Sequence, residues 1–123
     1  MSFIEQIKKR AKKELKTIVL PEATDIRILE ATQIVKNEKY AKVILIGEED
    51  KIKEKAKENN IDIGETQIID PIKSNKKEEY AKTLYELRKT KGMTEEEAKK
   101  LILDPVYFGM IMVKLGEADG LVS

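Results

Sequence analysis

Short apolar runs alternate along this chain with longer stretches in which apolar and charged positions follow a helical period. The runs "TIVL" (17–20), "KVILIG" (42–47) and "TQIID" (66–70) have the length of strands and stop at a proline or a glycine. A helix is expected at about 49–58, between the second and third runs. Because strands and helices alternate, we expect an α/β fold with three layers, a mostly parallel sheet and flanking helices.

Two more helices are expected near the start of the chain. The first runs to about Lys16, because Ser2 and Glu5 have the spacing of a capping box and apolar residues recur on one face. The second begins after the first strand, where Thr24 or Asp25 can provide the cap. The residues expected to point inward from these two helices are Phe3, Ile4, Ile7, Ala11, Leu15, Ile28, Leu29, Ala31, Ile34 and Val35.

A helical insertion at about 75–116 interrupts the alternation. Three helices in series are expected there, at about 75–91, 94–103 and 105–116. Such an insertion is typical of a surface subdomain or an oligomer contact. The boundary signals are Asn75 with Glu78 and Thr94 with Glu97 as capping boxes, Gly92 as a left-handed helix end, and Asp104 with Pro105 as a cap and first turn.

The last residues have the pattern of a turn that enters a buried strand. Gly120 opens this segment, and Leu121 and Val122 continue it. Strands of parallel sheets are normally buried on both faces, so we expect the sheet to be incomplete at the C-terminus. Residues 1–123 are therefore expected to be the N-terminal part of a larger domain, with no domain boundary inside.

Composition removes several classes of function. The chain has no cysteine and no histidine, so thiolate chemistry, histidine general bases and the usual zinc sites are absent from its 123 residues. Charged residues make up 38%, but the net charge is only +1, which gives no field favouring nucleic acid or an anionic membrane. There is no long apolar run and no signal-peptide pattern, so we expect a cytoplasmic protein.

Arginine is scarce, and its positions are the best indication of a binding site. Of 24 basic residues only three are arginine, Arg10, Arg27 and Arg88. Arg10 lies in a lysine-rich run and is most simply a solvated helix charge. Arg27 falls in the first turn of the helix after the first strand, where parallel sheets bind anions, although a pair with Glu22 or Asp25 is equally available. Arg88 lies near a helix end, where a cation also stabilises the helix dipole.

Other candidates are weaker. The carboxylates Glu22, Asp25 and Asp119 fall near strand ends, and Asp25 fits a helix cap better than a base. The glycines never show the spacing of a dinucleotide fingerprint or a Walker A loop. Tyr107, Phe108, Met110 and Met112 could line an apolar pocket, but an ordinary core or interface helix is the simpler interpretation.

Four segments of the chain together resemble the N-terminal part of phosphate acetyltransferases, which are also called phosphotransacetylases. The segments are "TIVLPEATDIRILEA", "ILIGEEDKIKEKAKE", "IIDP" and "YELRKTKGMTEEEAKKLILDPVYFGMIMVKLGEADGLVS". Each is modestly specific alone, but they occur in the family's order and spacing over the whole chain. The resemblance implies an enzyme of two α/β domains, commonly a dimer, that transfers an acetyl group between acetyl phosphate and coenzyme A.

The resemblance also assigns roles to two residues. In the family, the arginines of the "LPE…D-R" and "YELRKxKG" segments are associated with coenzyme A, which implies that Arg27 and Arg88 bind its phosphate groups. Coenzyme A and acetyl phosphate would be substrates, with no tightly bound cofactor and no metal. The family's catalytic aspartate, serine and arginine belong to the C-terminal end of the full protein, so no catalytic residue is expected in this chain.

Other assignments remain open at this point. Phosphate butyryltransferases share the fold but lack the "YELRKxKGMT" insertion, which argues against them. Malic enzymes can carry a similar regulatory domain, but Met1 stands directly before the first helix, which favours a free-standing enzyme. A different class is a non-catalytic module that binds coenzyme A or a partner and acts with a separate C-terminal chain. A purely structural protein would bind no coenzyme A.

Overall fold

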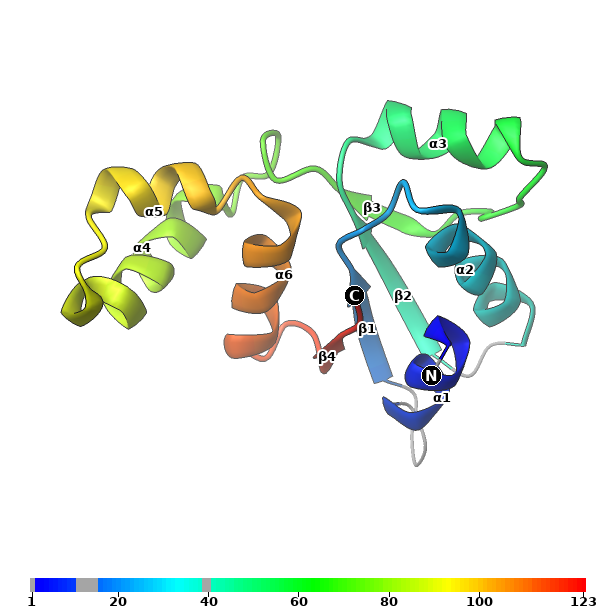
Figure 1. Cartoon of the computed structure of the whole chain (residues 1–123), viewed down its shortest axis with the longest axis horizontal. Coiled ribbons are helices and arrows are strands. Elements are labelled where there is room, and N and C mark those ends of the chain that lie inside the picture. Colours follow the sequence, from blue (N-terminus) through cyan, green and yellow to red (C-terminus); the bar gives the residue numbers. More distant parts are fainter. Residues whose placement is uncertain (1, 11–15, 39–40) are drawn as a thin grey trace.

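Among the residues that the structure describes, four parallel strands form the centre of the fold (Figure 1). The computed structural model describes residues 2–10, 16–38 and 41–123. Its sheet has the order β3-β2-β1-β4, so the first two strands are central and pair over five residues. This confirms the expected parallel α/β sheet. The strands are β1 (Lys16–Leu20), β2 (Ala41–Ile46), β3 (Gln67–Ile69) and β4 (Gly120–Leu121).

In the described part of the chain, six α-helices surround the sheet or project from it. α1, α2 and α3 lie together on one side in Figure 1, whereas α6 lies on the other side with α4 and α5 beyond it. A short 3₁₀ helix, η1 (Lys89–Lys91), continues α4. The helices are α1 (Phe3–Arg10), α2 (Ile26–Glu38), α3 (Glu49–Glu58), α4 (Lys77–Arg88), α5 (Glu95–Leu101) and α6 (Pro105–Lys114).

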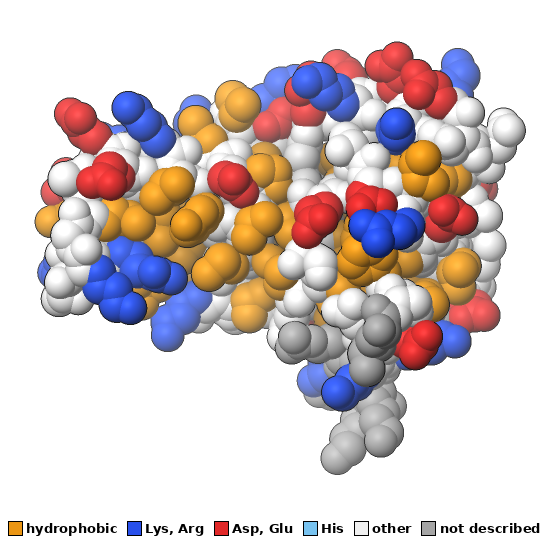
Figure 2. All heavy atoms as spheres, viewed as in Figure 1, with side chains coloured by type: hydrophobic (Ala, Val, Ile, Leu, Met, Phe, Trp, Pro, Cys, Tyr) orange, Lys and Arg blue, Asp and Glu red, His pale blue; other side chains and the backbone are white. Residues whose placement is uncertain are grey.

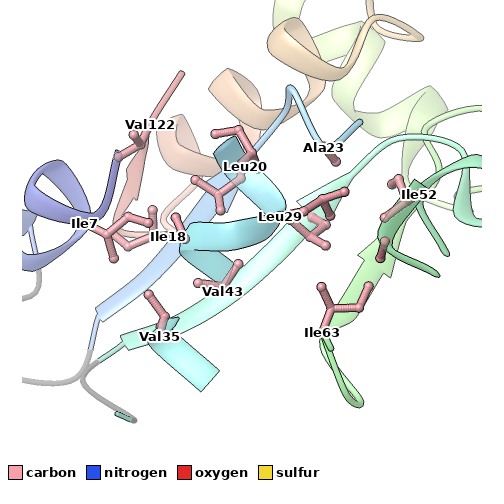
Figure 3. Packing of buried hydrophobic residues seen from close by; sticks show 14 residues of the cluster. Ile7, Ile18, Leu20, Ala23, Leu29, Val35, Val43, Ile52, Ile63 and Val122 are labelled. Atoms are coloured by element: carbon pink, nitrogen blue, oxygen red, sulfur yellow. The ribbon is translucent and has the colours of Figure 1, made fainter. Parts of the chain in front are cut away.

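The two central strands bury apolar side chains on both faces, as parallel strands usually do. Ile18 and Leu20 of β1 belong to the core under α1–α3, whereas Val19 between them belongs to the core under α6. β2 repeats the alternation in register, so each face carries a continuous apolar layer. Figure 3 shows the first of these cores, with labelled residues Ile7, Ile18, Leu20, Ala23, Leu29, Val35, Val43, Ile52, Ile63 and Val122.

The second core joins the helical insertion to the sheet. Phe108 of α6 is 1% exposed and contacts Tyr80 of α4, with ring centroids 4.8 Å apart and planes at 59°. This tilted arrangement is one that aromatic pairs favour. The Tyr80 hydroxyl donates a hydrogen bond to Glu117, in the loop between α6 and β4. α4 is therefore attached both to α6 and to the chain that returns to the sheet.

Several local predictions are confirmed. Thr94 and Glu97 form a complete capping box at α5, and Asp104 caps α6 with Pro105 in its first turn. Gly92 has φ +91°, the left-handed conformation expected at that helix end.

Other boundaries were wrong. The box at Asn75 and Glu78 does not form, because α4 begins only at Lys77, and the Ser74 hydroxyl accepts a hydrogen bond from the Lys76 amide instead. Lys16 is the first residue of β1 and not the end of a helix. The expected helix positions Ala11 and Leu15 lie outside the described residues.

Two apolar helix residues face solvent, and one of them, Ile34, was expected to point inward. Ile34 of α2 is 40% exposed, whereas Thr32 lies on the buried face of the helix. The Thr32 hydroxyl donates a hydrogen bond to the Ile28 carbonyl at 2.8 Å. This bond satisfies the buried hydroxyl inside the helix, so a polar residue is accepted where the periodicity favoured an apolar one. Leu87, near the end of α4, is 42% exposed.

Gly109 marks the place where α6 comes closest to the sheet. A Cβ atom there would lie 2.9 Å from Leu121 Cδ1 and 3.1 Å from Ile46 Cδ1, closer than van der Waals contact. The missing side chain is thus what allows Phe108, Ile111 and Met112 to reach the sheet.

Gly109→Val should lower the free energy of unfolding by about 1–3 kcal/mol, because the added side chain overpacks this contact. Met110→Val is the matched control, since it places the same β-branched residue one position along, where the side chain is 41% exposed. Urea unfolding followed by circular dichroism measures both. An unchanged or higher stability of Gly109→Val would contradict the packing account, because valine forms helices better than glycine and only overpacking lowers the stability here.

Candidate functional site

Arg27 lies at the edge of the sheet where parallel sheets bind ligands. β1 ends at Leu20, residues 21–25 form the connecting loop, and α2 begins at Ile26. The N-terminus of α2 therefore points to the carboxyl ends of the strands, as expected from the sequence. The Arg27 side chain is 72% exposed there.

The structure resolves which acid pairs with Arg27. Arg27 Nη2 lies 2.8 Å from Asp25 Oδ2 and Nε lies 3.2 Å from Oδ1, which makes a two-pronged hydrogen bond. Asp25 Oδ1 also accepts the Arg27 backbone amide at 2.9 Å, so the same carboxylate caps α2. The hydrogen bond from the arginine side chain lowers the pKa of Asp25, and the same bond raises the pKa of Arg27. Asp25 is thus an ionised cap and not a candidate general base.

Phe3 is a second partner of Arg27 that the sequence did not indicate. The guanidinium carbon lies 5.0 Å from the centroid of the Phe3 ring, within the range of a cation–π interaction. A hollow of about 310 Å³ opens beside this contact between α1 and α2. Phe3 and Arg27 are 24 positions apart, so only the docking of α1 on α2 brings them together. The hollow is lined by Ser2, Phe3, Ile4, Arg27, Glu30, Ala31 and Ile34.

Arg88 lies in a different part of the molecule. Arg88 is the last residue of α4, and this end of α4 lies on the side of the insertion that is turned away from the sheet (Figure 1). Arg27, in contrast, lies in α2 beside the sheet. The Arg88 carbonyl accepts the Met93 amide at 3.3 Å, and its half-buried side chain forms no ion pair within the described part of the chain. The structure therefore does not bring the two predicted arginines into one site.

A larger groove of about 560 Å³ lies along the surface where α4 and α5 meet. Ala81, Tyr85, Ile102 and Leu103 supply its apolar surface, while lysines and glutamates alternate around it. Neither sign of charge prevails there, so the groove has no evident preference for an anion or a cation. Its charged residues are Lys77, Glu78, Lys82, Glu86, Glu95 and Lys99.

Asp119 has a structural role. Its carboxylate accepts the Thr17 amide at 2.8 Å, and its own amide donates to the Thr17 carbonyl at the same distance. These bonds tie the start of β4 to the start of β1, at the amino ends of the strands. Asp119 is therefore at the opposite edge of the sheet from Arg27.

Charges of both signs are interspersed over the face in Figure 2, whereas apolar side chains spread over the helices of the insertion. No group of three acidic residues with metal-binding geometry occurs among residues 2–10, 16–38 and 41–123. Within the same ranges, no helix has the length and apolar character needed to cross a membrane. The two predicted arginines thus lie in two separate places: Arg27 is exposed beside the sheet and paired with Asp25, and Arg88 lies in the insertion.

Comparison with known proteins gives a consistent assignment. The family model described as phosphate acetyl/butaryl transferase matches residues 2–123. The chain is 54% identical over its whole length to the phosphate acetyltransferase of Acetivibrio thermocellus and 50% identical to that of Thermoanaerobacterium thermosaccharolyticum. It spans 36% and 37% of the length of these two relatives.

Two solved structures share the fold. The phosphotransacetylase EutD from Staphylococcus aureus superposes with a TM-score of 0.83 at 36% identity, covering 98% of this chain and 36% of that one. A phosphotransacetylase from Streptococcus pyogenes gives 0.82 at 28% identity with the same coverage of both chains. Together with the family match over residues 2–123, these likenesses show that the chain belongs to the phosphate acetyl/butaryl transferase family.

Proposed function

We propose that this chain is the N-terminal, mainly coenzyme A-binding part of a phosphate acetyltransferase. The complete enzyme would interconvert acetyl-CoA plus phosphate with coenzyme A plus acetyl phosphate, a reaction of acetate metabolism. The observation that carries the proposal is identity of 54% over all 123 residues to a protein named for this activity. The whole protein is proposed to be a cytoplasmic homodimer without a tightly bound cofactor.

Two arginines are proposed to bind phosphate groups of coenzyme A. Arg27 supports this role because its guanidinium is exposed at the carboxyl edge of the sheet, beside a helix N-terminus. Arg88 supports it because its half-buried side chain has no acidic partner in the described ranges. Since the two arginines lie in different elements, the first turn of α2 and the end of α4, each is proposed to contact a phosphate group of its own.

No residue of this chain is proposed to act in the chemical step. The resemblance to phosphate acetyltransferases places the catalytic aspartate, serine and arginine in the part of the enzyme that this chain does not span, and the sequence has no histidine or cysteine. The second candidate is a non-catalytic module that binds coenzyme A and acts with a separate C-terminal chain. Identity of 54% to a phosphate acetyltransferase of which this chain spans 36% favours the first candidate over this module.

Replacing either arginine by lysine should weaken coenzyme A binding by about tenfold, because an ammonium group neutralises a phosphate without gripping it through two parallel hydrogen bonds. Isothermal titration of the 123-residue chain with coenzyme A measures the change in Arg27→Lys and Arg88→Lys. Lys53→Ala is the control, since it removes an exposed cation that pairs with Glu49 on α3. Absence of binding by the unmodified chain would contradict the proposed function.

The purified chain should form no detectable acetyl-CoA from acetyl phosphate and coenzyme A. Adding the part of the Acetivibrio thermocellus enzyme that this chain does not match tests the second candidate. Restored turnover would support a chain that works with a separate partner, whereas binding without restored turnover supports a single longer enzyme. Turnover by the chain alone would contradict the assignment of the catalytic groups to the rest of the protein.

A further inference from the structure

Arg27 is held on two sides before any ligand arrives. Asp25 engages Nε and Nη2, the side edge of the guanidinium, at 3.2 and 2.8 Å. Phe3 lies against the guanidinium, with its ring centroid 5.0 Å from Cζ. The side chain nevertheless remains 72% exposed. A planar guanidinium has five N–H donors, so the end edge formed by Nη1 and the second hydrogen of Nη2 is still available for a two-pronged contact.

Asp25 is itself anchored. Its Oδ1 accepts the Arg27 amide at 2.9 Å, and its carbonyl accepts the amides of Ile28 and Leu29 at 3.0 and 3.1 Å. The Asp25 carboxylate is therefore held at the first turn of α2, and its hydrogen bonds hold the Arg27 guanidinium in the same place. Phe3 adds a second support from α1, a helix that contacts α2.

An arginine that is free in solvent loses side-chain freedom when it binds an anion, and this loss weakens binding. A guanidinium already oriented by partners loses less. Asp25 also opposes anion binding by its charge, but water and salt screen this repulsion at an exposed site, whereas the orientation is kept. These effects have opposite signs, so the affinity of a variant without the Asp25 charge tells which one prevails.

We propose that Asp25 and Phe3 are positioning residues that orient Arg27 so that its end edge meets a phosphate group of the ligand. This inference rests on the proposed coenzyme A-binding role of Arg27. It adds that the effective site is a set of three residues from α1, the β1–α2 loop and α2. The N-terminal helix thereby becomes part of the binding surface and not only a cover for the sheet.

The test is the affinity for coenzyme A, measured by isothermal titration calorimetry on the 123-residue chain. Asp25→Asn should weaken binding about threefold to tenfold, because asparagine keeps the helix cap but cannot hold the guanidinium as an ion pair. Phe3→Leu should weaken it in the same direction. When Arg27 is already lysine, Asp25→Asn should not weaken coenzyme A binding further, because lysine has no planar pair of N–H donors that Asp25 could orient.

Asp104→Asn is the matched control. Asp104 caps α6 in the same way, with Oδ1 accepting the Val106 amide at 2.8 Å, but it holds no arginine. Its substitution should leave the affinity for coenzyme A unchanged. A second readout is the ¹⁵N relaxation of Arg27 Nε in the ligand-free chain, which should indicate a rigid group in the unmodified chain and a mobile one in Asp25→Asn.

The outcomes separate the two proposals. In one outcome the unmodified chain binds coenzyme A and Arg27→Lys binds it more weakly, but Asp25→Asn binds it equally well or more tightly. Asp25 then competes with the ligand, and only the positioning role is overturned. If Arg27→Lys binds as well as the unmodified chain, the role of Arg27 and its positioning fall together while the proposed function stands. If the unmodified chain does not bind coenzyme A, the proposed function fails and takes this inference with it.

Discussion

Burial of β1 and β2 on both faces is the constraint on which the rest of this structure depends. Adjacent residues of each strand enter different cores, so helices must cover the sheet on two sides. α1, α2 and α3 cover one face, and α6 covers the other with α4 packed on it through Tyr80 and Phe108. The close approach of α6 depends on Gly109, because no side chain larger than hydrogen fits between the helix and the sheet without displacement.

The same constraint places the candidate site. Helices that cover a parallel sheet must start at the carboxyl edge of the strands, so the first turn of α2 and its arginine are exposed there. The loop before α2 supplies Asp25, which serves as helix cap and as partner of the guanidinium. The arrangement of Phe3, Asp25 and Arg27 at this edge therefore depends only on the β1–α2 connection and on the contact of α1 with α2.

The helical insertion has a different physical basis. α4 and α5 pack on each other and reach the sheet through α6 and the bond between Tyr80 and Glu117. Its boundaries could be predicted where a local hydrogen bond defines them, as at Thr94 and at Asp104. The start of α4 could not, because the turn after Pro71 delays the helix and its N-cap, Lys76, has no side-chain cap hydrogen bond.

The sequence by itself determined the strand and helix order, the parallel sheet, the helix starts at Thr94 and Asp104 and the place of Arg27 in the first turn of a helix, because these follow from periodicity and local hydrogen bonding. Family membership could also be inferred from motif order. Only the tertiary structure decided that Arg27 pairs with Asp25 and not Glu22, that Phe3 lies against it, and that Arg88 is remote. Contacts between residues far apart in the chain depend on how helices dock, and no local pattern records that geometry.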